Sequence, residues 1–175
     1  IKRCSVQKDP DSMKRNLNMY VLSEDRFGKL TSTNITIKNN LKTWLNHYRM
    51  INDTIDILDP YIVNIGIEFQ ARPAVGADRY VALQQAIDAL KDLYSTSFYI
   101  GEPLYVTDIY AKLREVNGLL DVTKVKLTNK TGGKYASTTF NINANMSPDG
   151  TYLIAPRNCI FEMKFPETDI KGTIK

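Results

Sequence analysis

Long apolar runs are absent from this chain of 175 residues, which also has only two cysteines and one histidine. A helix that crosses a membrane needs about 20 predominantly apolar residues in a row, and the apolar runs here are only a few residues long. The opening Ile1-Lys2-Arg3-Cys4 leads into polar sequence without the apolar region of a signal peptide. Because the first residue is not Met, we expect a C-terminal fragment of a longer polypeptide.

The two cysteines, Cys4 and Cys159, lie near opposite ends of the chain and are too few for a disulfide framework. No Cys-x-x-Cys or Cys/His spacing suits zinc, so no metal site is predicted. Disulfides are rare in proteins without an export signal, so we expect two unpaired thiols. The apolar context of Cys159 predicts a small core residue.

Catalysis of the Ser-His-Asp or Cys-His type would have to use His47, the one histidine. This residue lies off the apolar stripe of a predicted helix and has no Ser, Cys or acidic partner nearby in sequence, so we interpret it as a surface histidine. Asp53, Asp56 and Asp59 recur every third residue, but the segment has the pattern of a strand, and calcium loops need denser oxygen ligands.

A phosphate-binding loop is suggested by Gly132-Gly133 between Lys130 and Lys134, but the required spacing of glycine, lysine and hydroxyl residues is missing. A hairpin turn explains these glycines better. We therefore predict no catalytic, cofactor-binding or metal-binding residues, no cofactor and no enzymatic activity.

The composition is that of a globular protein, with 43% apolar and 24% charged residues, and it excludes a disordered or fibrous chain. The net charge of +4 is unevenly spread, with +6 on residues 1–50 and −2 on residues 51–175. The positive excess is dilute and interrupted by acidic residues, which makes it weak support for nucleic acid binding. We interpret it as a solvated surface.

One helical face is indicated by five apolar residues with i, i+4, i+7, i+8 and i+11 spacing: Ile37, Leu41, Trp44, Leu45 and Tyr48. A tryptophan on such a stripe usually lies in the core, so we expect Trp44 to be buried rather than to form a stacking platform. Residues 1–16 show no period and predict a linker or arm, and residues 19–22 predict a short strand.

The clearest strand signal runs over residues 61–70, where apolar and polar residues alternate. The apolar set is expected to face the core: Tyr61, Val63, Ile65, Ile67 and Phe69. The alternate residues are expected to face solvent: Asn64, Gly66, Glu68 and Gln70. One buried and one solvated face is typical of an antiparallel or mixed sheet with helices on one side.

Two more helices are predicted by apolar stripes in the middle of the chain. The first stripe consists of Tyr80, Leu83, Ile87, Leu90 and Tyr94, with Asp78 near its start. The second consists of Ile109, Leu113 and Val116, with Thr107 as its expected cap and Gly118 as the expected left-handed residue after its end.

The remaining sequence predicts strands over residues 122–127, 136–142, 152–154 and 159–165, with Glu162 opposite the core-facing residues. The order of elements predicts an α+β fold, with an antiparallel or mixed sheet, helices packed on one face and two successive split β-α-β units. We expect an arm over residues 1–16, a small β-α-β lobe over 17–58 and a larger α+β lobe with C-terminal hairpins over 59–175.

A nucleic-acid-binding module of the RNA-recognition type is the main alternative, because an α+β sheet with ten tyrosines and a pI near 9.0 is compatible with such a fold. Those sheets read bases with aromatic side chains on the exposed face. In the segment 61–70 the aromatic residues fall on the apolar side instead, which weakens this alternative. A small enzyme that uses His47 is a third and weaker possibility.

Three segments resemble the baseplate J-like family, whose members are wedge proteins of contractile-tailed phages and related injection machines: LKTWLNHYRMINDTIDILDPYIVNIGIEFQARP, DRYVALQQAIDALKDLY and IGEPLYVTDIYAKLREVNGLLDVTKVKL. The order and spacing of these segments, over roughly residues 17–128, carry the resemblance. The long tail after Leu127 is more similar to the large wedge proteins of T4-like phages.

The resemblance implies a structural role without catalytic residues. It implies a virion protein of the tail baseplate, assembled in the host cytoplasm, with contacts to itself as a homodimer and to neighbouring wedge proteins. No nucleic acid or membrane partner is implied.

Overall fold

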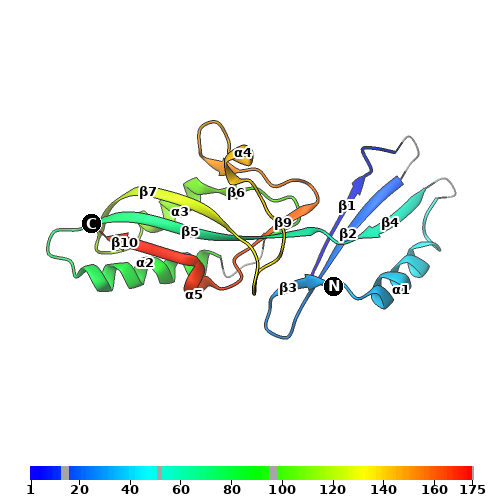
Figure 1. Ribbon diagram of the computed structural model, residues 1–175, viewed down its shortest axis with the longest axis horizontal. Helices are drawn as coiled ribbons and strands as arrows, with labels where there is room; N and C mark the ends of the chain where they lie inside the picture. Colours follow the sequence, from blue (N-terminus) through cyan, green and yellow to red (C-terminus); the bar gives the residue numbers. More distant parts are fainter. Residues whose placement is uncertain (13–15, 51–52, 95–97, 175) are drawn as a thin grey trace.

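The computed structural model describes residues 1–12, 16–50, 53–94 and 98–174, and it has two lobes that lie next to each other along the long axis (Figure 1). Each lobe contains a four-stranded sheet with both parallel and antiparallel neighbours, and a further two-stranded sheet belongs to the larger lobe. The described residues form five helices and ten strands, which confirms the predicted α+β class.

The smaller lobe contains five elements: β1 (Arg3–Lys8), β2 (Asn16–Glu24), β3 (Leu30–Ser32), α1 (Ile35–Leu45) and β4 (Thr54–Leu58). Strand β2 is central, with β1 antiparallel along one edge. The other edge of β2 pairs first with β4, which runs parallel, and then with β3, which runs antiparallel. The parallel neighbours β2 and β4 are adjacent, whereas a split β-α-β unit would place a strand between them.

The expectation of a linker over residues 1–16 is wrong for Arg3–Lys8, which form the edge strand β1. An edge strand is held by backbone hydrogen bonds to its neighbour and therefore needs no apolar period. Side-chain bonds to the larger lobe add to this, since Arg3 Nε donates to the Phe98 carbonyl at 3.1 Å and Gln7 Nε2 donates to the Arg157 carbonyl at 2.7 Å.

The larger lobe contains the other ten elements: β5 (Tyr61–Pro73), α2 (Arg79–Leu93), β6 (Leu104–Tyr105), α3 (Val106–Arg114), β7 (Leu119–Lys130), α4 (Ile142–Asn145), β8 (Tyr152–Leu153), β9 (Cys159–Glu162), α5 (Pro166–Asp169) and β10 (Ile170–Ile174). Strand β5 is the centre of the main sheet. It pairs antiparallel with β7 on one edge and parallel with β9 and then β10 on the other.

The main core lies between this sheet and the helices α2 and α3. Val63, Ile65, Ile67 and Phe69 are at most 1% exposed and belong to one cluster with residues of both helices, which confirms their predicted orientation. Tyr61 was expected on the same face but is 57% exposed, because it lies at the start of β5, ahead of the part of the strand that the helices cover.

The opposite face of the sheet is covered at one end, so the prediction of a fully solvated face is wrong for Asn64 and Gly66, which are buried. The segment after β7 crosses this end, where the Ala136 N–H donates to Asn64 Oδ1 at 2.7 Å. Since this segment packs over the sheet, it does not form the strand expected over residues 136–142. Its Phe140 ring instead meets the core ring of Phe161 edge-on, with centroids 5.7 Å apart.

A second, small core joins the two lobes. Its buried members are Leu22, Leu30 and Ile160, which come from β2, β3 and β9. Glu162, expected to face solvent, is buried at the same joint and accepts hydrogen bonds from the Leu30 N–H and from Asn64 Nδ2, both at 2.7 Å. One carboxylate thus connects a strand of each lobe.

The helix ends agree in part with the sequence prediction. Asp78 is the N-cap of α2 and accepts a hydrogen bond from the Tyr80 N–H at 2.8 Å, as its position before the helix suggested. Thr107 was expected to cap α3, but that helix begins at Val106 after Tyr105, which makes no side-chain capping bond.

Gly118 has the predicted left-handed backbone with φ of +90°, but it lies in the turn that enters β7 and not at the C′ position of α3, which ends at Arg114. A Cβ there would also lie 3.3 Å from the Cβ of Ala82. We expect Gly118→Ala to lower the free energy of unfolding by about 1–2 kcal/mol in urea titrations. Gly132→Ala, with φ of +80° in open space, should cost less, and a larger loss at Gly132 would contradict this account.

Candidate interaction surfaces

The residues considered for catalysis lie apart from one another. His47 is exposed, with Nδ1 3.0 Å from the Thr43 carbonyl oxygen. Cys4 is an exposed residue of the smaller lobe and Cys159 a buried one of the larger lobe, where burial raises the pKa of its thiol and disfavours the nucleophilic thiolate. Within the part of the chain that the structure describes, no three His, Cys, Asp or Glu residues are grouped as metal ligands.

The three aspartates between α1 and β5 have structural contacts. The Asp59 carboxylate pairs with Lys38 and also accepts from the Thr33 N–H at 3.4 Å. Asp56 lies 3.5 Å from Lys42 Nζ. At Asp53 the backbone carbonyl accepts from Arg49 at 2.8 Å. These aspartates therefore hold α1 and the segment after it against β4.

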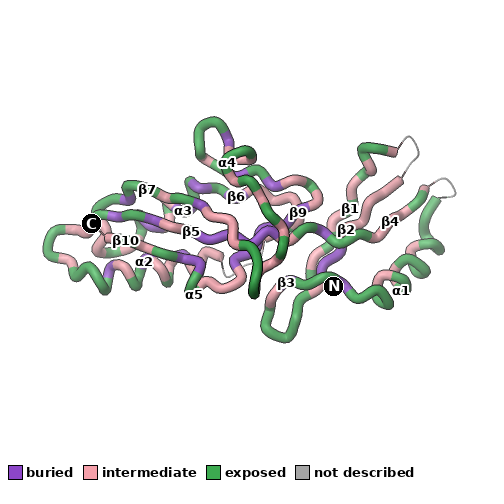
Figure 2. The backbone as a smooth tube through the Cα atoms, in the orientation of Figure 1, coloured by how far each residue is buried: buried purple, intermediate pink, exposed green. Residues whose placement is uncertain are grey.

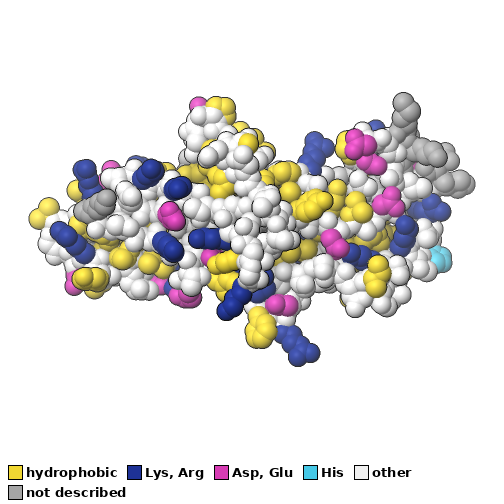
Figure 3. All heavy atoms as spheres, viewed as in Figure 1, with side chains coloured by type: hydrophobic (Ala, Val, Ile, Leu, Met, Phe, Trp, Pro, Cys, Tyr) yellow, Lys and Arg dark blue, Asp and Glu magenta, His cyan; other side chains and the backbone are white. Residues whose placement is uncertain are grey.

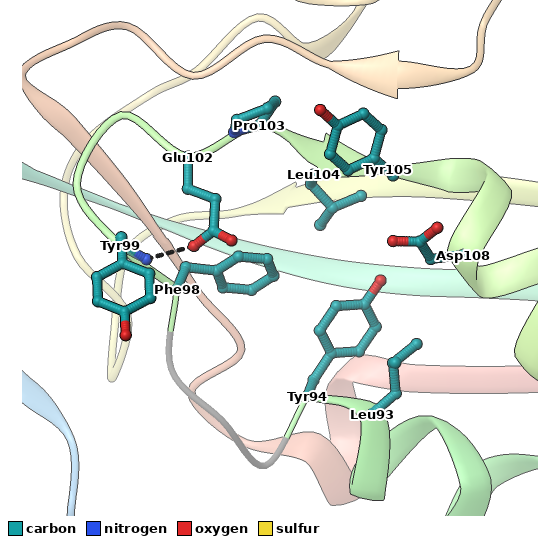
Figure 4. A pocket seen from close by; sticks show the side chains of 9 residues that line it. All are labelled: Leu93, Tyr94, Phe98, Tyr99, Glu102, Pro103, Leu104, Tyr105 and Asp108. Atoms are coloured by element: carbon teal, nitrogen blue, oxygen red, sulfur yellow. Dashed lines mark hydrogen bonds between the residues drawn. The ribbon is translucent and has the colours of Figure 1, made fainter.

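A hollow between the end of α2 and the start of α3 brings aromatic and acidic side chains together (Figure 4): Tyr94, Phe98, Tyr99, Glu102, Tyr105 and Asp108. Glu102 is turned onto the backbone, where Oε2 accepts from the Tyr99 N–H at 2.6 Å. Burial raises the pKa of Tyr94, and the negative charge of Asp108 raises it further. Tyr94 therefore remains a neutral phenol at physiological pH.

This hollow encloses about 210 Å³, below the roughly 300 Å³ at which small-molecule sites begin. One of its rings already takes part in a cation–π interaction, because the Arg3 guanidinium lies 4.7 Å from the centroid of Tyr99. Phe98 also packs against the small core between the lobes. We interpret the hollow as part of the joint that holds β1 to the larger lobe.

Helix α1 forms where the apolar spacing predicts it, with Asn34 as N-cap accepting from the Thr36 N–H at 2.8 Å. None of its residues is buried, and the prediction that Trp44 lies in the core is wrong, because this side chain is 57% exposed. Lys38 pairs with Asp59 and Lys42 pairs with Asp56, so polar side chains of α1 contact the β4 region. Of the apolar stripe, Leu41 and Leu45 are half-buried. Ile37, Trp44 and Tyr48 remain exposed, and Figure 2 shows α1 as mostly exposed.

Four exposed side chains of this stripe and of the turn after it form what we call the α1 surface: Ile37, Trp44, Tyr48 and Met50. The rings of Trp44 and Tyr48 lie 4.6 Å apart, centroid to centroid, at a tilt of 44°. Tyr48 and Met50 line a shallow hollow of about 280 Å³ together with Leu17 and Ile55 of the sheet. Grouped apolar side chains that stay exposed mark sites of association with other macromolecules.

The outer face of the larger sheet is basic where it remains open, and Figure 3 shows Lys and Arg side chains spread along this lobe. Lys124, Lys126 and Lys171 surround Glu68 and Gln70 there. The prediction that Glu68 and Gln70 face solvent is confirmed, since Glu68 is half-buried and Gln70 exposed. No aromatic side chain shares this face with them in the open rows of the described β5, β7 and β10.

A scan of the chain against protein-family models gives no match, and a comparison with well-characterised proteins gives none either. The resemblance to the baseplate J-like family therefore remains a prediction from the sequence. Among the described residues, no helix combines the length and the apolar character needed to cross a membrane.

Proposed function

We propose that this chain is a structural component of the tail baseplate wedge of a contractile-tailed bacteriophage, where it holds neighbouring subunits together. In this proposal it belongs to the virion, is assembled into tails in the host cytoplasm, and contacts both a second copy of itself and other wedge proteins. The motif order over residues 17–128 supports the family, and the α1 surface supports the role.

The α1 surface is the observation that carries the proposal. Trp and Tyr are the residues that most often dominate the energy of protein interfaces, and here Trp44 and Tyr48 lie ring against ring while 57% and 71% exposed. No residue of this 11-residue helix is fully buried, and only Leu41 and Leu45 of its apolar stripe are half-buried against its own lobe. A partner that covers its apolar stripe would supply the missing burial, at about 25 cal/mol per Å² of apolar area.

The alternative, a nucleic-acid-binding module of the RNA-recognition type, lacks its most characteristic feature. Such sheets stack bases on aromatic rings of their exposed face. The open rows of the described β5, β7 and β10 carry lysines there, and the ring of Phe69 beside them is buried in the core. The exposed aromatic pair lies in the other lobe instead, with Trp44 on α1 and Tyr48 in the turn after it.

We expect the isolated chain to be a monomer or homodimer in light scattering, and to copurify with at least one baseplate protein from the neighbouring open reading frames. A dimer that persists at micromolar concentration corresponds to about 8 kcal/mol of association free energy. The double variant Trp44→Ser with Tyr48→Ser should weaken binding of the partner by at least about tenfold, because it removes two interface anchors. Its melting temperature should change little, since both side chains are exposed.

A matched control replaces two exposed apolar residues of α2 in the other lobe, Tyr80→Ser with Val81→Ser, which are 85% and 53% exposed. This control should bind the partner as the wild type does. A strictly monomeric wild-type chain that binds none of the neighbouring tail proteins would overturn the proposal.

A further inference from the structure

The open part of the outer sheet face has a regular arrangement of charges set by the strand register. Glu68 of β5 pairs across the sheet with Lys126 of β7 on one side and with Lys171 of β10 on the other. The next row on the same face places Gln70 between Lys124 and Thr173. Three lysines thus stand on one flat face with a single carboxylate among them.

These three lysines are not neutralised by the fold. All three are exposed, and none of them takes part in an ion pair with another described residue. The same face is covered at its other end, where the segment after β7 lies over Asn64, and Lys130 and Asp169 lie over Gly66. The lysine rows are therefore the part of the face that remains accessible, and they line a shallow hollow of about 370 Å³.

We propose that this lysine face, defined by Lys124, Lys126 and Lys171, is a docking surface for a carboxylate-rich polypeptide segment in extended conformation. Lys124 and Lys126 are two residues apart on one strand, so their side chains project about 7 Å apart. Acidic residues at alternate positions of an extended partner segment have the same spacing. Gln70 and Thr173, which share a row of the sheet with Lys124, can hydrogen-bond to the polar groups of such a segment.

A polypeptide fits this face better than a nucleic acid does. Proteins that bind single strands without sequence preference combine positive charge with aromatic stacking platforms. The one aromatic residue that borders the lysine face among the described residues is Phe69, and it is 1% exposed because its side chain belongs to the core behind the sheet. Glu68 also stands at the centre of the face and would repel a continuous line of phosphates.

The proposal is independent of the baseplate assignment and of the α1 surface, because it is tested on the chain by itself. The probe is a short fluorescein-labelled peptide of alternating Glu and Thr, and binding is followed by fluorescence anisotropy. The comparison peptide has the same composition with all Glu residues in one block. We expect the alternating peptide to bind more tightly, and its affinity to fall at raised salt because the contacts are exposed charges.

Two pairs of substitutions remove the same charge from different places. Lys126→Gln with Lys171→Gln should lower the affinity for the alternating peptide by about tenfold or more, since both charges flank the bound segment. Lys8→Gln with Arg26→Gln, two exposed residues of the smaller lobe, should lower it by less than about twofold through long-range charge only. Glu68→Gln should raise the affinity, a change that partial unfolding would not produce.

Three results would overturn the proposal. The first is the absence of binding by the wild-type chain. The second is an equal loss of affinity in the Lys126→Gln/Lys171→Gln variant and in the Lys8→Gln/Arg26→Gln variant. The third is tighter binding of a single-stranded oligonucleotide of the same charge, which would assign the lysine face to nucleic acid.

Discussion

Ile65→Asp is expected to lower the free energy of unfolding by about 3 kcal/mol or more, because it places an unpaired carboxylate in the main core. Ile65 is 0% exposed in the middle of β5 and belongs to the cluster that includes Ala86 of α2 and Ile109 of α3. The neighbouring Asn64 points to the opposite face, where its side chain bonds to Glu162 and Ala136. It therefore offers no hydrogen bond to a carboxylate placed in the core at position 65.

The matched control is Glu68→Thr, three residues along the same strand on the opposite face. Glu68 is half-buried and makes no ion pair with a described residue, and Thr is a favourable strand residue. We expect this change to cost less than about 0.5 kcal/mol, as is usual for surface positions. Urea titrations would measure the free energy of unfolding of both variants. Equal losses of stability would show that the assignment of the two faces is wrong.

Glu162→Leu is expected to cost about 2–4 kcal/mol, because two buried donors lose their acceptor at once. The Leu30 N–H and the Asn64 amide both donate to this carboxylate at 2.7 Å, one from each lobe. Glu162→Gln should also destabilise, by about 1–3 kcal/mol, since its amide offers one acceptor where two are needed. Asn64 cannot compensate by turning over, because its Oδ1 already accepts from the Ala136 N–H.

Glu167→Gln is the control for this prediction, because the Glu167 side chain is 78% exposed and its pairing with Lys91 is that of a surface ion pair. Such pairs contribute about 0–1 kcal/mol, so the change should be small. Differential scanning calorimetry of the three variants would measure the losses. A Glu162→Leu protein as stable as Glu167→Gln would mean that Glu162 does not connect the lobes.

The strand β5 could be predicted from the sequence because apolar and polar residues alternate along it. The alternation has a single physical cause, since one face of the strand packs against the helices. The orientation of Val63, Ile65, Ile67 and Phe69 follows from period two and a buried face. The helices α2 and α3 were predictable for the same kind of reason, since Leu90, Ile109 and Leu113 are buried on their stripes.

Other features depend on contacts between distant segments, which a local pattern does not encode. Asn64 is contacted by Ala136 from a distant segment, Glu162 is contacted by Leu30 of the other lobe, and the two side chains also bond to each other. The strand β1 was missed because an edge strand gains its stability from backbone bonds to β2.

The helix that carries Trp44 was predicted correctly, but the expectation that the core of its own lobe covers this side chain was wrong. The spacing of the stripe defines an apolar face without saying what covers it, and the lobe itself leaves Trp44 57% exposed. Lys38 and Lys42, which pair with Asp59 and Asp56, are indistinguishable from other surface lysines in the sequence. The same error points to the proposed contact, because Trp44 and Tyr48 are apolar side chains that their own lobe leaves exposed and that a partner could cover.

Site-specific photo-crosslinking from position 44 tests the structural role most directly. The chain would carry a photoreactive phenylalanine analogue in place of Trp44 and, as a control, in place of Tyr80 on the other lobe, and would be assembled with the proteins of its neighbouring open reading frames. The account predicts a crosslink from position 44 to a baseplate protein or to a second copy of the chain, and none from position 80. Crosslinks of equal yield from both positions, or none from position 44 in assembled tails, would contradict it.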